Sequence, residues 1–191
     1  MSLTIRTFIA VDLNPRIKKT IKHIQNYLDR ANCDVKWVKP ENIHLTLKFL
    51  GDINIKEIDA LTQLLSNLLQ NIKPIETEFT LLNAFPDISQ PHIIWAGLKD
   101  DSQKIAHLVK FLEKSLGRIG FKEEQKPFRP HITIGRIRTQ NNISNLSHAL
   151  SDYTVPDTQT QTIKHITLYK STLTSHAPIY DKLATFDLHN D

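Results

Sequence analysis

The sequence predicts an α+β protein with two pseudo-symmetric lobes, whose mostly antiparallel sheets line a central groove. Short runs of β-branched and aromatic residues alternate along the chain with stretches in which apolar residues recur at helical spacing. The order strand, helix, strand, helix, strand occurs twice, over about residues 5–86 and 91–174. Two long units of this kind are typical of paired lobes rather than of a solenoid. We therefore expect a single domain over 1–191, with residues 175–191 intertwined with both units.

The spacing of the predicted strands supports this duplication. The first and second strands are 36 residues apart in the first unit and 38 residues apart in the second unit. The second and third strands are 35 residues apart in both units. This agreement favours an internal repeat over a chance succession of similar elements.

The first unit opens with residues 7–13, TFIAVDL, which predict a buried strand because they are mostly β-branched, aromatic or aliphatic. Asn14 is expected to cap a helix that begins at Pro15. The run HLTLKFL at 44–50 predicts the second strand, and FTLLNAF at 79–85 predicts the third. The apolar residues at helical spacing are Ile17, Ile21, Ile24 and Leu28 in the first helix, and Ile58, Leu61, Leu64, Leu65 and Leu68 in the second.

The second unit repeats this order. Residues 92–98, HIIWAGL, predict its first strand, and a helix is expected to begin at Asp101 or Ser102. The run HITIGR at 131–136 predicts the second strand, and ITLYKSTL at 166–173 predicts the closing strand. The apolar residues of its helices are Ile105, Leu108, Val109, Leu112 and Leu116, followed by Leu146 and Leu150.

The overall composition limits the class of protein and of ligand. The formal charge of +4 and the sequence pI of about 9.1 favour an anionic ligand without specifying one. Cys33 is alone, so no intramolecular disulfide can form and the cytoplasm is the expected compartment. No apolar run approaches the roughly 20 residues of a membrane span, and the N-terminal stretch is interpreted as a strand rather than a signal peptide.

Two His-x-Thr triplets occupy equivalent places in the two units. Alternate residues of a strand point to the same face, so His44 and Thr46 project together, as do His131 and Thr133. Facing lobes would bring two imidazoles and two hydroxyls to one groove. Such a set suits phosphoryl chemistry, because one His can act as base and the other as acid while the hydroxyls donate to phosphate oxygens.

The remaining polar and aromatic candidates carry weaker signals. His165 and Thr167 form a third triplet that the repeat does not duplicate, so we interpret them as ordinary residues at the start of a strand. Lys48 is expected to be solvated, and Leu45, Leu47 and Phe49 are expected to face the core. Core packing is also favoured for Phe128 over stacking on a base, and the sequence does not decide whether Arg6 reaches the groove. Neither duplicated motif has a third ligand at zinc-binding spacing, so no metal and no other cofactor is expected.

The duplicated motifs resemble those of a known superfamily. HLTL and HITI resemble the paired H-x-T-x signatures of the 2H phosphoesterases, and the chain as a whole is similar to bacterial and archaeal RNA 2′,3′-cyclic phosphodiesterases, historically called 2′-5′ RNA ligases. The resemblance runs from Arg6 to Leu188. It includes RTFIAVDL, ENIHLTLKFLG, IIWAGL, KPFRPHITIGR, ITLYKSTL and APIYDKLATFDL.

This resemblance implies metal-independent hydrolysis of a 2′,3′-cyclic phosphate at an RNA 3′ end, leaving a 2′-phosphate. It implies that His44 protonates the departing 3′ oxygen and that His131 activates water, although the residues themselves do not determine which His is the acid. It further implies that Thr46, Thr133 and Arg136 bind the phosphate, and the historical name of the family implies a reversible 2′-5′ ligation.

Arg136 presents a geometric difficulty. Counted from His131 it lies an odd number of residues along the strand, so regular alternation would direct it away from the groove. A bulge at Gly135 would redirect it.

Other functions remain open at this point. A phosphoesterase for small cyclic nucleotides or 2′-5′ oligonucleotides would use the same residues, and a non-catalytic module could bind RNA ends. In each case we expect a monomer that has no contact with a membrane.

Overall fold

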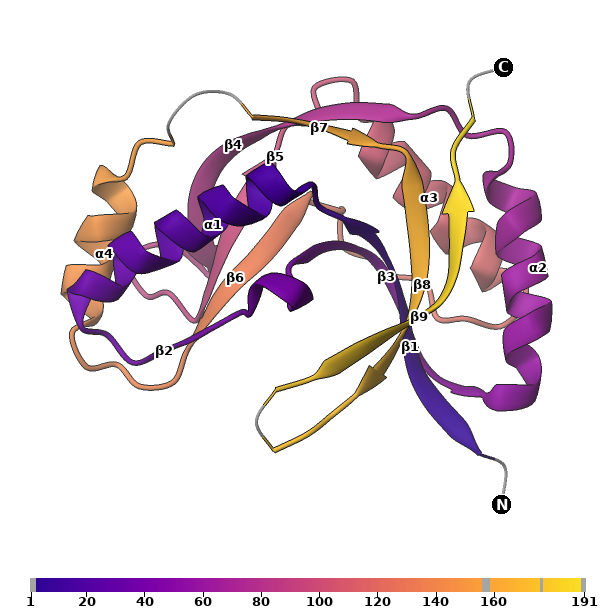
Figure 1. Ribbon diagram of the computed structural model, residues 1–191, viewed down its shortest axis with the longest axis horizontal. Coiled ribbons are helices and arrows are strands. Elements are labelled where there is room, and N and C mark those ends of the chain that lie inside the picture. The colour runs from indigo at the N-terminus through magenta and orange to yellow at the C-terminus, as the bar shows by residue number, and fades with distance from the viewer. Residues whose placement is uncertain (1–2, 156–158, 176, 190–191) are drawn as a thin grey trace.

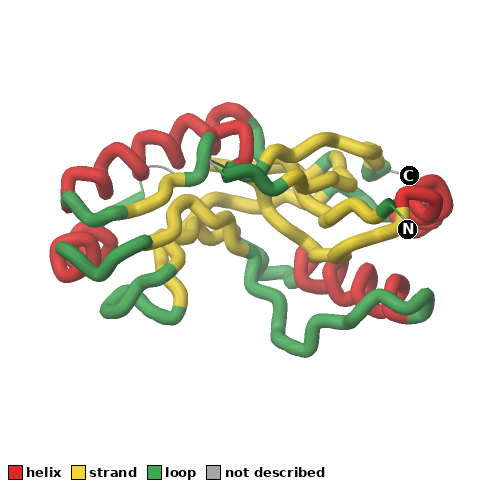
Figure 2. The backbone as a smooth tube through the Cα atoms, turned by 90° about the horizontal axis from the view of Figure 1, so that it is seen from below, coloured by secondary structure: helices red, strands yellow, loops and turns green. Residues whose placement is uncertain are grey.

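The computed structural model describes residues 3–155, 159–175 and 177–189 of the chain. It has the predicted α+β architecture, with two antiparallel sheets and the helices around them (Figure 1). Figure 2 shows the α-helices at the periphery of the molecule and the strands between them. None of the helices in these three segments is long and apolar enough to cross a membrane.

Each sheet contains strands from both halves of the chain. The first sheet has the order β3-β1-β8-β9, and the second has the order β2-β6-β5-β4-β7. The strands of the first sheet are β1 (Thr4–Asp12), β3 (His44–Asn54), β8 (His165–Thr172) and β9 (Ile179–Asp187). Those of the second are β2 (Val35–Trp37), β4 (Ile75–Phe85), β5 (Ile93–Leu98), β6 (His131–Ile137) and β7 (Gln159–Ile163).

The third strand of each predicted unit pairs with the first strand of the other unit. Strand β8, from the second unit, pairs with β1, and β4, from the first unit, pairs with β5. Two helices are exchanged in the same way. Helix α1 (Pro15–Leu28) contacts β6 and β7, and α3 (Lys104–Gly117) contacts β3. Helix α2 (Ile58–Leu69) lies against β9, and α4 (Ile143–Asp152) lies beside α1 (Figure 1).

Local signals explain where the helices begin. The Asn14 side chain accepts a hydrogen bond from the backbone N–H of Ile17 at 2.8 Å, as predicted for a cap that precedes Pro15. The predicted start of α3 at Asp101 or Ser102 is wrong, because the helix begins at Lys104. The Asp100 carboxylate instead accepts from the N–H groups of Ile105 and Ala106, and residues 101–103 form a turn that leads into the helix.

Candidate active site

The two duplicated motifs stand at the starts of strands that touch across the two sheets. His44 is the first residue of β3, at the edge of the first sheet, and His131 is the first residue of β6, next to the short edge strand β2. Strands β3 and β6 are in contact. Segments 87 residues apart in sequence are thereby brought together along the line where the sheets meet.

Each imidazole is held by the same local hydrogen bond. The Nδ1 atom of His44 lies 2.8 Å from the carbonyl oxygen of Asn42, and the Nδ1 atom of His131 lies 2.8 Å from that of Arg129. A carbonyl oxygen only accepts, so Nδ1 carries the proton in both rings. In the neutral rings, Nε2 is therefore the atom with a free lone pair. The Thr46 hydroxyl donates to that atom of His44 at 3.0 Å.

The surroundings of His44 disfavour its charged form. Burial lowers the pKa of His44 to about 4, and the charge of Lys18 acts in the same direction. The Asn42 carbonyl and the Asp12 carboxylate oppose this effect without overcoming it. Near pH 7 the ring is consequently neutral in the absence of a bound anion.

A bulge in β6 places Arg136 on the same face as the motif residues. Opposite residues of paired strands lie on the same side of a sheet, and His131, Thr133 and Arg136 lie opposite alternate residues of β5. The register shifts between Thr133 and Gly135, which leaves Ile134 as the extra residue of β6. The bulge expected from Gly135 is therefore present, and Arg136 is exposed on the motif face.

A second bulge, in β3, reverses the predicted positions of two residues. His44, Thr46 and Phe49 lie opposite alternate residues of β1, because the register of β3 shifts after Thr46. The prediction that Phe49 packs in the core is wrong, since its side chain is 68% exposed on the motif face. The prediction that Lys48 is solvated is also wrong, since its side chain is only 2% exposed.

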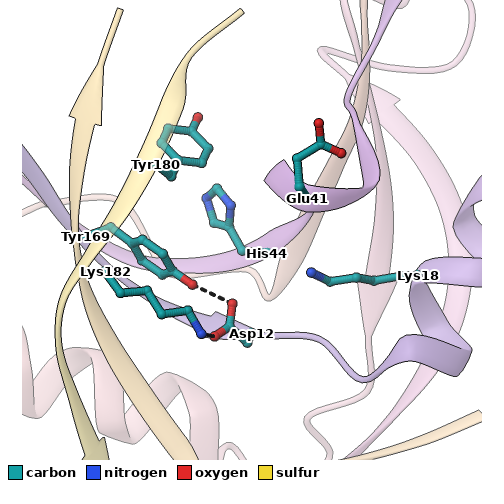
Figure 3. Close-up of a pocket in the computed structure, with 7 residues that line it drawn as sticks. All are labelled: Asp12, Lys18, Glu41, His44, Tyr169, Tyr180 and Lys182. Carbon is teal, nitrogen blue, oxygen red and sulfur yellow. Dashed lines mark hydrogen bonds and ion pairs between the residues drawn. The ribbon is translucent and has the colours of Figure 1, made fainter.

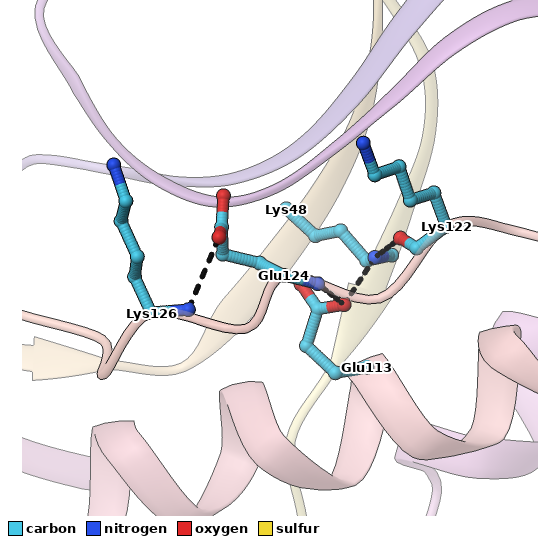
Figure 4. A network of polar contacts seen from close by, with 5 residues as sticks. All are labelled: Lys48, Glu113, Lys122, Glu124 and Lys126. Atoms are coloured by element: carbon cyan, nitrogen blue, oxygen red, sulfur yellow. Dashed lines mark hydrogen bonds and ion pairs between the residues drawn. The ribbon is translucent and has the colours of Figure 1, made fainter.

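Lys48 lies opposite Ile9 of β1 and therefore points away from the motif face. Its side chain forms a buried network (Figure 4). Its ammonium group pairs with the Glu113 carboxylate on α3 and donates to the backbone carbonyl of Lys122 at 2.8 Å. The same carboxylate accepts from the backbone N–H of Glu124 at 3.0 Å. The first motif strand is thus tied to α3 and to the loop that leads into the second motif strand.

A cavity of about 390 Å³ lies beside His44 (Figure 3). The Asp12 carboxylate, at the end of β1, accepts from the Tyr169 hydroxyl at 2.5 Å and from the Lys182 ammonium at 2.6 Å. Burial acts to raise the pKa of Asp12, but these two hydrogen bonds and the charge of Lys18 outweigh it, so the pKa is lowered. The residues lining the cavity are Asp12, Lys18, Glu41, His44, Tyr169, Tyr180 and Lys182.

The cavity residues other than His44 were not predicted as functional. They come from β1, α1, β8, β9 and the turn before β3, and no short motif unites them. Asp12 lies opposite His44 in the register of β1 against β3, a relation that becomes known only once the pairing of these strands is known.

Aromatic and basic side chains surround the imidazoles. The His44 ring centroid lies 5.0 Å from that of Phe8 and 5.3 Å from that of Tyr180. Burial raises the pKa of Tyr180, while the charges of Arg136 and Arg6 act to lower it, so both arginines lie within electrostatic reach of this ring. The face around His44 therefore combines stacking surface with positive charge.

The third His-x-Thr triplet has different surroundings. The His165 ring is exposed, and its Nδ1 atom lies 2.6 Å from the Asp187 carboxylate on β9. Thr167 is buried and lies opposite Ala10 of β1. Within residues 3–155, 159–175 and 177–189, no group of three or more His, Cys, Asp or Glu side chains is arranged to hold a metal ion.

Comparison with known proteins relates the whole chain to one group. The sequence model of the LigT like phosphoesterase family matches residues 11–95 and 97–180, one stretch for each half. A protein of Methanocaldococcus jannaschii named RNA 2′,3′-cyclic phosphodiesterase is 32% identical, over 92% of this chain and 96% of its own. A protein of Thermotoga maritima with the same name is 30% identical, over 93% of this chain and 92% of its own.

Solved structures share the fold. The crystal structure of TT0787 of Thermus thermophilus has a TM-score of 0.79 at 23% identity, and the match covers 96% of this chain and 97% of that one. That of E. coli LigT complexed with 3′-AMP has a TM-score of 0.77 at 22% identity, covering 98% of this chain and 100% of the other.

Proposed function

We propose that this chain, which belongs to the family of LigT-like phosphoesterases, hydrolyses 2′,3′-cyclic phosphate at RNA 3′ ends and leaves a 2′-phosphate. The names of relatives that match more than nine-tenths of the chain support this substrate. The observation that carries the proposal is the repeated setting of the two imidazoles, each with Nδ1 on a carbonyl and Nε2 available for proton transfer. The reaction needs no cofactor and no second subunit.

The two rings perform complementary proton transfers. Nε2 of His131 takes a proton from water as the water oxygen forms a bond to phosphorus. The bond from phosphorus to the 3′ oxygen breaks, and that oxygen takes the proton from Nε2 of His44. One water is consumed, and the products are a 2′-phosphomonoester and a 3′-hydroxyl. With a 5′-hydroxyl group in place of water, the same steps form a 2′-5′ linkage.

The remaining motif residues stabilise charge on the phosphate. Thr46 and Thr133 lie on the face of the imidazoles. When Nε2 of His44 carries the proton that it gives to the 3′ oxygen, it no longer accepts from Thr46, and both hydroxyls are then suited to donate to the non-bridging oxygens. Arg136 lies on the same face and offers a fixed fork of donors to the anion. Protein donors would thus provide the charge stabilisation that a metal ion gives in other phosphoesterases.

The decisive experiment uses an RNA oligonucleotide that ends in a 2′,3′-cyclic phosphate, with an excess of chelator. We expect conversion to a 2′-phosphate end at a rate that the chelator does not change. An unchanged substrate after prolonged incubation with folded protein would overturn the proposal, and activity lost with the chelator would overturn its metal-independent mechanism.

The pH dependence tests the role of His44 as acid. Its pKa is about 4 in the free protein, and a bound phosphate anion favours the imidazolium and raises that pKa. The pH profile of kcat/KM reports pKa values of the free enzyme, and that of kcat reports pKa values of the enzyme–substrate complex. We therefore expect the decrease in rate caused by loss of the His44 proton to occur at higher pH in the kcat profile than in the kcat/KM profile. Coincident limbs would contradict the assignment of His44 as acid.

Phe49 is positioned to stack on the base of the terminal nucleotide. Phe49 is 68% exposed, and its ring centroid lies 6.1 Å from that of Phe8. It is the next residue after Thr46 on the motif face, about 7 Å further along the strand. We expect Phe49→Ala to lower kcat/KM for adenosine 2′,3′-cyclic phosphate about tenfold relative to base-free glycerol 1,2-cyclic phosphate. Phe111→Ala, at an exposed ring on α3, should leave this ratio unchanged. An unchanged ratio for Phe49→Ala would exclude the stack.

A further inference from the structure

The direction of Arg136 depends on a single extra residue in β6. Without the bulge at Ile134, regular alternation would turn Arg136 to the opposite side of the sheet from His131 and Thr133. That opposite side is the core, where Ile132 and Ile134 are fully buried. Whatever holds the bulge therefore decides whether the guanidinium is presented on the motif face.

A buried glutamine on α1 contacts the bulge directly. The side-chain amide of Gln25 donates to the carbonyl oxygen of Ile134 at 2.9 Å and to that of Val38 at 2.8 Å. The backbone N–H of Val38 donates to the same Ile134 carbonyl at 2.9 Å. The carbonyl of the extra residue thus accepts from two donors, and the side-chain amide of Gln25 joins β6 to the residue that directly follows β2.

The position of Gln25 is otherwise apolar. Its side chain is 2% exposed, and the other fully buried residues of α1 are isoleucine and leucine. An uncompensated amide in such a place costs free energy, and an aliphatic residue would pack there without that cost. A glutamine at this position is therefore explained by the two carbonyl groups that it satisfies.

Gly135 leaves room for the side chains of β2 beside the bulge. A Cβ atom at this position would lie 2.8 Å from the Trp37 ring and 2.8 Å from a methyl group of Val35, both on β2. Strand β2 pairs in regular register with β6 at this point, setting Trp37 opposite Gly135. At the bulge, the backbone of β6 is therefore packed closely against β2 side chains and is also held by the Gln25 amide.

We propose that Gln25 is a positioning residue for phosphate binding, which fixes the Ile134 bulge and thereby directs Arg136 toward the phosphate. This inference rests on the proposed function, in which Arg136 binds that phosphate. Gln25 itself touches neither substrate nor imidazole. Its effect on the reaction passes through the backbone of β6.

The test is a double-mutant cycle with two readouts. Gln25→Met, which removes the amide and keeps the length of the side chain, is combined with Arg136→Met. The readouts are hydrolysis of adenosine 2′,3′-cyclic phosphate and binding of inorganic phosphate by calorimetry. Thr20→Val is the matched control, because Thr20 is a buried polar residue of the same helix. Gly135→Ala perturbs the bulge independently, should Gln25→Met fail to fold.

We expect Arg136→Met to lower kcat/KM by roughly 10²- to 10³-fold and Gln25→Met to lower it by about tenfold. In protein that already carries Arg136→Met, adding Gln25→Met or Gly135→Ala should lower kcat/KM by less than about twofold further, because the effects of coupled residues are not additive. Thr20→Val should stay within about twofold of wild type.

Effects of Gln25→Met and Arg136→Met that multiply, or full activity of Gln25→Met, would overturn the inference. If wild-type protein binds phosphate but does not hydrolyse the cyclic phosphate, the proposed function fails. The double-mutant cycle is then evaluated from the phosphate affinities of the variants, which decide the role of Gln25. Protein that does neither overturns both proposals.

Discussion

Replacing either His44 or His131 by alanine is expected to slow hydrolysis of a 2′,3′-cyclic phosphate at least about 100-fold, the size of effect that loss of a general acid or base produces. The double replacement should cost much less than the product of the single effects, because the two rings act in one step. Initial rates at saturating substrate, with circular dichroism to verify folding, measure this outcome.

His165→Ala is the matched control for these variants. His165 begins the third His-x-Thr triplet on β8, but its ring pairs with Asp187 on the neighbouring strand. We expect its replacement to leave the rate within about threefold of wild type, as is usual for surface positions outside a site. A large loss for His165→Ala with little change for His131→Ala would show that the wrong triplet has been assigned to catalysis.

Replacing Lys48 by methionine is expected to destabilise the protein by roughly 3–5 kcal/mol, because the buried Glu113 carboxylate would lose its countercharge. The ammonium group also holds the Lys122 carbonyl, so the loop that leads to His131 should loosen as well. Urea unfolding followed by circular dichroism gives the free energy of unfolding for this variant and for wild type.

The double variant Lys48→Met, Glu113→Leu separates charge burial from packing. Its stability should recover substantially toward that of wild type, since an apolar pair can replace a buried ion pair. A second control is Lys99→Met, which removes a pair with Asp101 on the surface and should hardly shift the urea midpoint. Equal losses for Lys48→Met and Lys99→Met would contradict the interpretation of Lys48 as a buried, structure-determining charge.

The sequence predicts local structure well wherever regular periodicity holds. Asn14 before Pro15 marks the start of α1, and simple alternation places His44 with Thr46 and His131 with Thr133. Alternation fails beyond each bulge, because one extra residue reverses the side chains that follow it until the register shifts again. Gly135 gives a signal for the bulge in β6, whereas no glycine or proline accompanies the one after Thr46. The sequence therefore allowed a redirected Arg136 to be considered in advance, whereas the exposed position of Phe49 could not be predicted.

Residues that depend on tertiary pairing were beyond prediction. Gln25 meets Ile134 across 109 positions of the chain, and Asp12 meets Tyr169 across 157. Neither pair has a periodic or compositional signal, since each contact arises only when strands and helices from both halves are assembled. The Lys48–Glu113 pair has the same origin, because it joins the first motif strand to a helix of the second half.

The placement of β1 between β3 and β8 has a consequence for synthesis of the chain. Strand β1 is synthesised long before β8, so one of its edges stays open until residues 165–172 have been made. Contacts this distant in sequence delay completion of the sheet, and an open edge in the meantime invites pairing with another chain. Deleting β8 and β9 would therefore leave an incomplete sheet that is prone to aggregate.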